Sequence, residues 1–108
     1  MARAVYSTQL LQLDGDPQPS GSFTVPAGLV AVVRDIVIWC GAAASGEYSE
    51  VWGPSGSSIL VSTYPATGYV LEHWTGRQVF TEGQSIGVAS NASGPGSVLV
   101  SGYLLSAS

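Results

Sequence analysis

Short apolar runs alternate with turn-forming clusters along the whole chain. Runs rich in Val, Ile, Leu, Trp and Tyr are separated by clusters of Gly, Pro, Asn, Asp and Ser. No window of about 12 residues keeps apolar residues at helical spacing without a Gly or Pro inside it. The pattern therefore predicts short strands joined by turns, which is typical of a β-sandwich or barrel. The predicted strands are 4–13, 22–25, 29–40, 49–52, 58–63, 69–75, 78–81, 85–89 and 97–105.

The strands at 29–40 and 97–105 are apolar on both faces. An antiparallel strand with one solvated face alternates apolar and polar residues, and these two do not. In the first of them we expect Val32, Ile36 and Ile38 to lie in the sandwich core. The opposite face lies either under another part of the same chain or in a subunit interface, and large apolar patches are rare on monomers. The predicted interface residues are Val33, Val37, Trp39, Leu99 and Tyr103.

Two adjacent charges, Arg34 and Asp35, interrupt the apolar strand 29–40. Neighbouring strand residues point to opposite faces, so each charge would lie in an apolar strip. An unpaired buried charge is very costly, and we therefore expect both residues in buried ion pairs. Glu72 and Glu50 are the candidate partners of Arg34. The pair is either internal, fixing the register of the sheet, or formed between subunits.

Composition adds a domain count and excludes several function classes. The chain has 108 residues, enough for one core, with three cations against seven carboxylates and a net charge of −4. Three scattered arginines cannot form the basic stripe that nucleic-acid binding needs. The longest apolar stretch contains Arg34 and Asp35, which argues against a transmembrane helix. Only 9% of residues are charged, which suits a protein that works inside an assembly.

No combination of residues predicts catalysis or metal binding. The chain has one histidine, His73, and one cysteine, Cys40, far apart in the sequence. The G-x-S-x-G pattern of a hydrolase nucleophile and the clustered ligands of a zinc site are both absent from the sequence. We therefore expect neither an enzyme nor a cofactor. Three aromatic residues in or beside loops could stack on sugars or cap the ends of the core: Tyr48, Trp52 and Tyr64.

The N-terminal strand is set apart from the rest of the chain by residues 14–21, a segment longer than a hairpin turn. This spacing leaves two alternatives open. Residues 1–13 form either a strand of their own sheet or an arm that pairs with a neighbouring subunit. We accordingly divide the chain into residues 1–21, an arm or strand with its linker, and residues 22–108, the sandwich domain.

Two stretches carry a resemblance to a known family. The segment SFTVPAG at 22–28, followed by VVRDIVI at 32–38, resembles the opening of small β-sandwich proteins in virions of tailed phages that infect actinobacteria. The stretch WTGRQVFTEGQSIGV at 74–88, with VSGYLL at 100–105, is similar to the last strands of trimeric tumour-necrosis-factor-like jelly rolls. The resemblance covers residues 22–105 and leaves out the N-terminal strand.

The resemblance implies an all-β, jelly-roll-like sandwich that forms a homotrimer on a phage particle without enzymatic activity. The resemblance does not specify a position on the particle. Our first hypothesis is a minor tail or tail-tip protein, assembled in the host cytoplasm and located in the virion beside other virion proteins. A capsid-decorating protein is the alternative within the same class. An alternative from another class is a carbohydrate-binding module that contacts the host cell wall through the loop aromatics.

Overall fold

The computed structural model describes residues 4–15, 18–43, 47–54, 59–63, 68–91 and 94–106. Every element of regular structure in these segments is a β-strand, as the pattern of short apolar runs predicts. The strands are β1 (Ala4–Gly15), β2 (Gly21–Thr24), β3 (Leu29–Ala43), β4 (Ser49–Trp52), β5 (Ile59–Thr63), β6 (Gly68–Phe80), β7 (Ser85–Ser90) and β8 (Gly96–Ser106).

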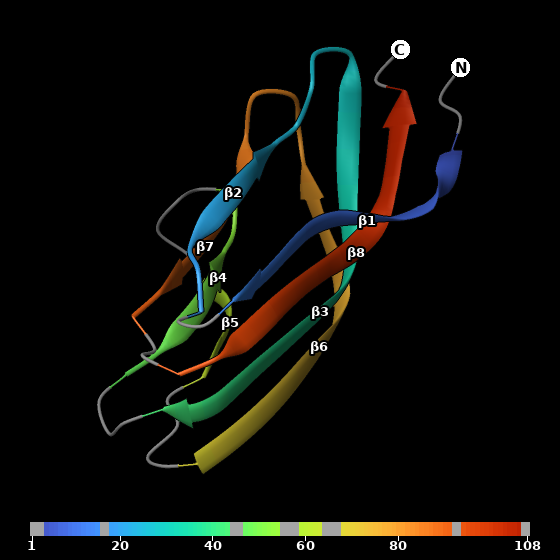
Figure 1. Ribbon diagram of the computed structural model, residues 1–108. Coiled ribbons are helices and arrows are strands. Elements are labelled where there is room, and N and C mark those ends of the chain that lie inside the picture. Colours follow the sequence, from blue (N-terminus) through green and yellow to red (C-terminus); the bar gives the residue numbers. More distant parts are fainter. Residues whose placement is uncertain are drawn as a thin grey trace.

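The strands form two antiparallel four-stranded sheets that face each other as a sandwich (Figure 1). The first sheet has the order β1-β8-β3-β6 and the second has the order β2-β7-β4-β5. Every connection except β4–β5 crosses between the sheets, which gives the jelly-roll arrangement of two interlocked Greek keys. The expected all-β, jelly-roll-like sandwich is therefore confirmed.

The N-terminal strand lies in the sheet of its own chain. β1 pairs with β8 from Ala4 opposite Leu105 to Gly15 opposite Gly96, and forms one edge of the first sheet. In this single chain the described part of the segment, from Ala4 onward, is a strand of its own sheet, and exchange of an arm between subunits stays a prediction. Leu10 of β1 also packs into the core. Whether residues 1–21 behave as a unit separable from 22–108 stays a prediction.

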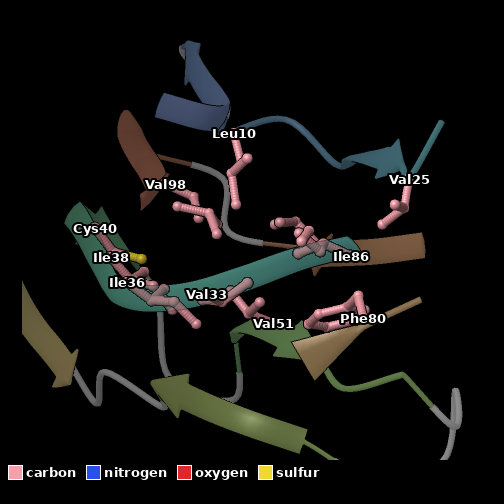
Figure 2. Close-up of a cluster of buried hydrophobic side chains, with 13 residues drawn as sticks. Leu10, Val25, Val33, Ile36, Ile38, Cys40, Val51, Phe80, Ile86 and Val98 are labelled. Atoms are coloured by element: carbon pink, nitrogen blue, oxygen red, sulfur yellow. The ribbon is translucent and has the colours of Figure 1, made fainter. Parts of the chain in front are cut away.

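The hydrophobic core lies between the sheets and takes residues from nearly every strand. Figure 2 shows Leu10, Val98 and Phe80 pointing toward a common centre with Ile36 and Val51. Most of these side chains are fully buried; Phe80, Ile36, Ile38, Val51, Ile86, Val98 and Val100 have no exposed surface. Burial of apolar surface is the main stabilising term, so this cluster holds the two sheets together.

A β-bulge at Arg34 changes which residues of β3 face the core. The register of β3 against β8 shifts between Val33 and Asp35, so one extra residue is accommodated there. After the bulge, Ile36 and Ile38 belong to the core cluster, as predicted. Before it, the core residues are Ala31 and Val33. An inserted residue reverses the alternation of a strand, and this reversal could not be seen in the sequence.

Two sequence-based assignments are wrong because of this bulge. Val33, predicted in the subunit interface, has no exposed surface and lies in the core. Val32, predicted in the core, lies opposite Tyr103 of β8 and Val79 of β6 on the outer side of the sheet. Only 2% of Val32 is exposed, so its predicted burial is confirmed. It is nevertheless buried on the outer side of the sheet and not in the core between the sheets.

Gly102 of β8 permits the bulge. A Cβ atom at this position would overlap the backbone carbonyl of Val32, since the two strands approach closely there. Only glycine tolerates such an approach of a neighbouring backbone.

The same irregularity extends into β6. The sequence predicts two strands, 69–75 and 78–81, separated at Gly76 and Arg77, but the structure has one strand. Gly76 and Arg77 form the register shift opposite Arg34 instead of a turn.

A buried glutamine joins three segments at one end of the sandwich. Gln18, 4% exposed, lies between β1 and β2. Its backbone nitrogen donates to the Gly94 carbonyl at 3.0 Å, and its side-chain oxygen accepts from the Cys40 thiol at 2.9 Å. Because a buried amide must be hydrogen-bonded to be tolerated, these contacts connect the β1–β2 segment to the ends of β3 and β8.

Candidate interaction surface

The outer face of the first sheet carries the predicted interface residues other than Val33. Side chains directly opposite in adjacent strands share a face, so the register gives rows across the sheet. One row contains Leu99 of β8, Val37 of β3 and His73 of β6. The next contains Ser97, Trp39 and Leu71 in the same strand order.

Two further rows extend this surface along the sheet. On one side of the Val37 row, Ser101, Asp35 and Thr75 lie opposite one another. Beyond the bulge, Val32 lies between Tyr103 and Val79. We call the set of residues in these four rows the outer face. It combines seven apolar or aromatic residues with five polar ones, of which three form one row and two, His73 and Ser97, lie in other rows.

The outer face is accessible in the isolated chain. Val37, Trp39, Leu99 and Tyr103 are each partly exposed. Leu71 is 66% exposed and Val79 is 43% exposed, and both lie on the edge strand β6. Polar residues of β1 border the opposite side, where Gln9, Gln12 and Asp14 are exposed. An apolar strip with a polar border is the composition of a protein-binding surface.

The predicted buried ion pairs are not found where they were expected. Arg34 is exposed, and its Nε donates to the backbone carbonyl of Gly76 at 2.9 Å. Because Arg34 is the bulged residue, its side chain leaves the apolar strip and meets the irregular part of β6. Glu50 is buried, at 7% exposure, but on β4 of the other sheet.

Asp35 pairs with His73, a partner that the sequence analysis did not consider. The His73 Nε2 and Asp35 Oδ1 atoms are 3.3 Å apart, with 55% and 49% of the two side chains exposed. The residues lie on adjacent rows of the outer face, diagonally across β3 and β6. Their separation of 38 positions in the chain gave no local signal; only the strand register brings them together.

The second sheet has a different outer face. Thr24 lies opposite Ser85, and their hydroxyl oxygens are 2.8 Å apart. Ser22 lies opposite Gly87. The residues between them in the sequence, such as Phe23 and Ile86, pack against or within the core. Small and hydroxyl-bearing side chains thus cover this part of the surface, as expected for a sheet in contact with water.

The predicted loop aromatics are only partly located. Tyr48 precedes β4 and Trp52 ends it, and each is partly buried. The Tyr48 backbone nitrogen donates to the Asn91 side-chain oxygen at 2.7 Å, which ties its loop to the end of β7. Tyr64 lies outside the described residues. Sugar binding by this group stays a prediction.

Other kinds of site were searched for within the described segments. They contain no pocket and no cluster of three potential metal ligands. They also contain no helix long and apolar enough to cross a bilayer. Within these segments, the outer face of the first sheet is therefore the feature that most needs a functional explanation.

Comparisons with known proteins give only distant likenesses. No family model and no curated protein matches the chain. Among solved structures, the chain is similar to the Drosophila NLP-core, described for pentamer formation and histone binding, with 19% identity, a TM-score of 0.43 and coverage of 94% of this chain and 98% of that one.

Two other structures show weaker similarity. The C-terminal CBM6 of LamC, a laminarinase from Zobellia galactanivorans, has 9% identity, a TM-score of 0.31 and coverage of 95% and 92%. Infectious bursal disease virus has 11% identity, a TM-score of 0.25 and coverage of 97% of this chain and 32% of the viral chain. At these values the likenesses carry no argument about function.

Proposed function

We propose that this chain is a non-enzymatic structural protein of a tailed-phage virion, a minor tail or tail-tip component that works as a homotrimer. The observation that carries the proposal is the outer face of the first sheet. Its apolar side chains are accessible in a single chain, whereas a second copy would remove them from water. The jelly-roll topology and the sequence resemblance support the virion assignment.

The physical argument begins with the size of the side chains. Trp39, Leu99 and Tyr103 lie in neighbouring rows, with Leu71 and Val79 on the adjacent edge strand. Removing apolar surface from water stabilises an association by about 25 cal/mol per Å² before the costs of ordering the partners. In a trimer with threefold symmetry each contact joins two different patches of neighbouring subunits, and every subunit buries the same residues, so the outer face is covered in all three subunits at once.

The electrostatic argument points the same way. The chain carries a net charge of −4, so copies repel one another over most of their surfaces. On the outer face the carboxylate of Asp35 lies beside His73, and the rows around it are uncharged apart from the border residue Asp14. Two copies that meet there therefore bring few like charges together.

Sedimentation velocity of the purified chain tests the association. We expect a species of about 33 kDa, three times the 11.1 kDa chain, with at least about 800 Å² buried per partner. A stable dimer would contradict the trimer but keep self-association. A monomer at all concentrations up to the millimolar range would contradict the proposal.

Labelling of the particle tests the location. Antibodies raised against the purified chain are applied to intact phage particles that encode it, and the gold label is located by electron microscopy. Label at the tail tip supports the proposed role. Label over the head supports a capsid-decorating protein instead, and particles without label contradict a virion role.

A further inference from the structure

We propose that the Asp35–His73 pair makes self-association through the outer face dependent on proton binding, so that assembly tightens as the pH falls from about 8 to 5.5. This inference rests on the proposed function, because it concerns regulation of the same surface. It is carried by the position of the pair. A histidine and a carboxylate, 3.3 Å apart, lie on adjacent rows of a surface whose other residues are uncharged.

The pair is set among uncharged neighbours. Asp35 lies in a row with Ser101 and Thr75, while His73 lies in the row of Val37 and Leu99. A second copy that covers these rows must also cover the pair, because His73 is part of the Val37 row and Asp35 lies in the next row toward the bulge. Covering it removes much of the water that now reaches about half of each side chain.

Water exclusion makes the charge state of the pair matter. In the free chain, solvent screens the attraction between an imidazolium and a carboxylate, and such an exposed pair is worth little. In a covered interface the same attraction is stronger, and a carboxylate without a cation beside it is costly. The assembled state therefore favours the protonated form of His73 beside Asp35.

Other charged groups near the pair were considered from each neighbouring strand. On β3, Arg34 points its guanidinium to the Gly76 carbonyl. On β6, Glu72 is adjacent to His73 in sequence and Arg77 lies four positions after it, and both are exposed. β8 presents Leu99 and Ser101, and β5, the strand nearest to β6 in the second sheet, contains no charged residue.

β1 contributes charge only at the border of the surface. Gln9 and Gln12 are uncharged, and Asp14 lies at the end of the Ser97 row, with its carboxylate accepting from the Gln12 amide. Among these groups, histidine is the one whose charge changes between pH 5 and 8. The expected pH dependence in that range therefore comes from His73.

The sign of the effect follows from proton counting. If the assembled state binds more protons than the free chains, lowering the pH shifts the equilibrium toward assembly. Each covered pair takes up at most one proton, so the dissociation constant falls by up to about tenfold per pH unit per pair.

The test is the dissociation constant, measured by sedimentation equilibrium at pH 5.5, 6.5, 7.5 and 8. The wild-type chain is compared with His73→Gln, which keeps a hydrogen-bond donor but cannot gain a charge, and with Asp35→Asn. We expect a pH-independent constant for His73→Gln. For Asp35→Asn we expect a flat or reversed dependence, since an imidazolium without its carboxylate opposes burial.

The control variant is Glu72→Gln, next to His73 and opposite Ile38 on the other side of β6. It should keep the wild-type pH dependence. Circular dichroism and urea unfolding confirm the fold of each variant. An oligomer whose constant does not change with pH, or Asp35→Asn with the wild-type slope, would overturn the inference while leaving the proposed function. A chain that is monomeric at every pH would overturn the proposed function.

Discussion

The outer faces of the two sheets differ although one chain supplies both. The second sheet presents Ser22, Thr24, Ser85 and other small residues to solvent, with Trp52 and Ile59, opposite each other on β4 and β5, as the large exceptions. The first sheet presents Val37, Trp39, Leu99 and Tyr103, with Leu71 and Val79 at its edge. The apolar character of the outer face is therefore not a general property of this composition. The outer side of the second sheet carries mostly small polar residues, whereas the outer side of the first sheet carries large apolar ones.

The two sides of the first sheet are expected to serve different purposes: the inner side stabilises the fold of one chain, and the outer side mediates self-association. Core residues such as Ile36 and Phe80 determine whether the sandwich folds, because they have no exposed surface. Residues of the outer face contribute less to the fold of one chain, since water still reaches them. Under the proposed function, substitutions on the core side of β3 lower the free energy of unfolding, whereas substitutions on its outer side weaken self-association.

The largest expected effect is on the core side of β3. Ile36→Ala should lower the free energy of unfolding by about 2–5 kcal/mol, because it leaves a cavity between the sheets. The matched variant Val37→Ala, one residue away on the outer face, should cost about 1 kcal/mol or less. Urea unfolding at low protein concentration measures both. Equal losses would show that the two sides of β3 are not distinct.

Gly102→Ala should cost about 1–3 kcal/mol, and more if the strands cannot separate, because the added methyl overlaps the Val32 backbone. The effect tests the bulge that assigns Val32 and Val37 to the outer face. Gly87→Ala on β7 is the control, since a Cβ there meets nothing within 4 Å. Urea unfolding of both variants gives the comparison. A Gly102→Ala chain as stable as the control would argue against the close approach of β3 and β8.

Leu99→Ser should weaken self-association by about 10- to 100-fold, the loss expected for one buried leucine at about 1.4 kcal/mol per factor of ten. Its matched control is Ala89→Ser on the outer side of the second sheet, which should leave the dissociation constant unchanged. Sedimentation equilibrium measures both variants. If Ala89→Ser weakens association as much as Leu99→Ser, the second sheet is part of the interface and the comparison fails.

The smallest expected effect is at Ser49 of β4. Its hydroxyl oxygen is buried and has no hydrogen-bond partner among the described residues. Ser49→Ala should therefore leave stability unchanged or raise it by up to about 1 kcal/mol, because an unsatisfied polar atom is removed. Thermal unfolding measures the change. A loss above about 1 kcal/mol would show that the hydroxyl has a hydrogen-bond partner.

Local sequence patterns were enough to predict the all-β class and the core positions of Ile36 and Ile38. Alternating turn clusters and apolar runs predicted an all-β sandwich, and the burial of Ile36 and Ile38 followed from their apolar neighbours at alternate positions. The strand 49–52 was predicted with its observed bounds. Such features depend on residues close together in the chain, where periodicity reflects which side of a strand meets water.

The faces of the first part of β3 and the partners of its charges depend on contacts between distant strands. The bulge at Arg34 depends on Gly102, a residue far along the chain, which lets two backbones approach. One inserted residue reverses a strand of period two, so Val32 and Val33 exchanged their predicted sides. Asp35 likewise met His73 through the register of β3 and β6. Periodicity along one strand cannot encode an irregularity that a distant strand creates.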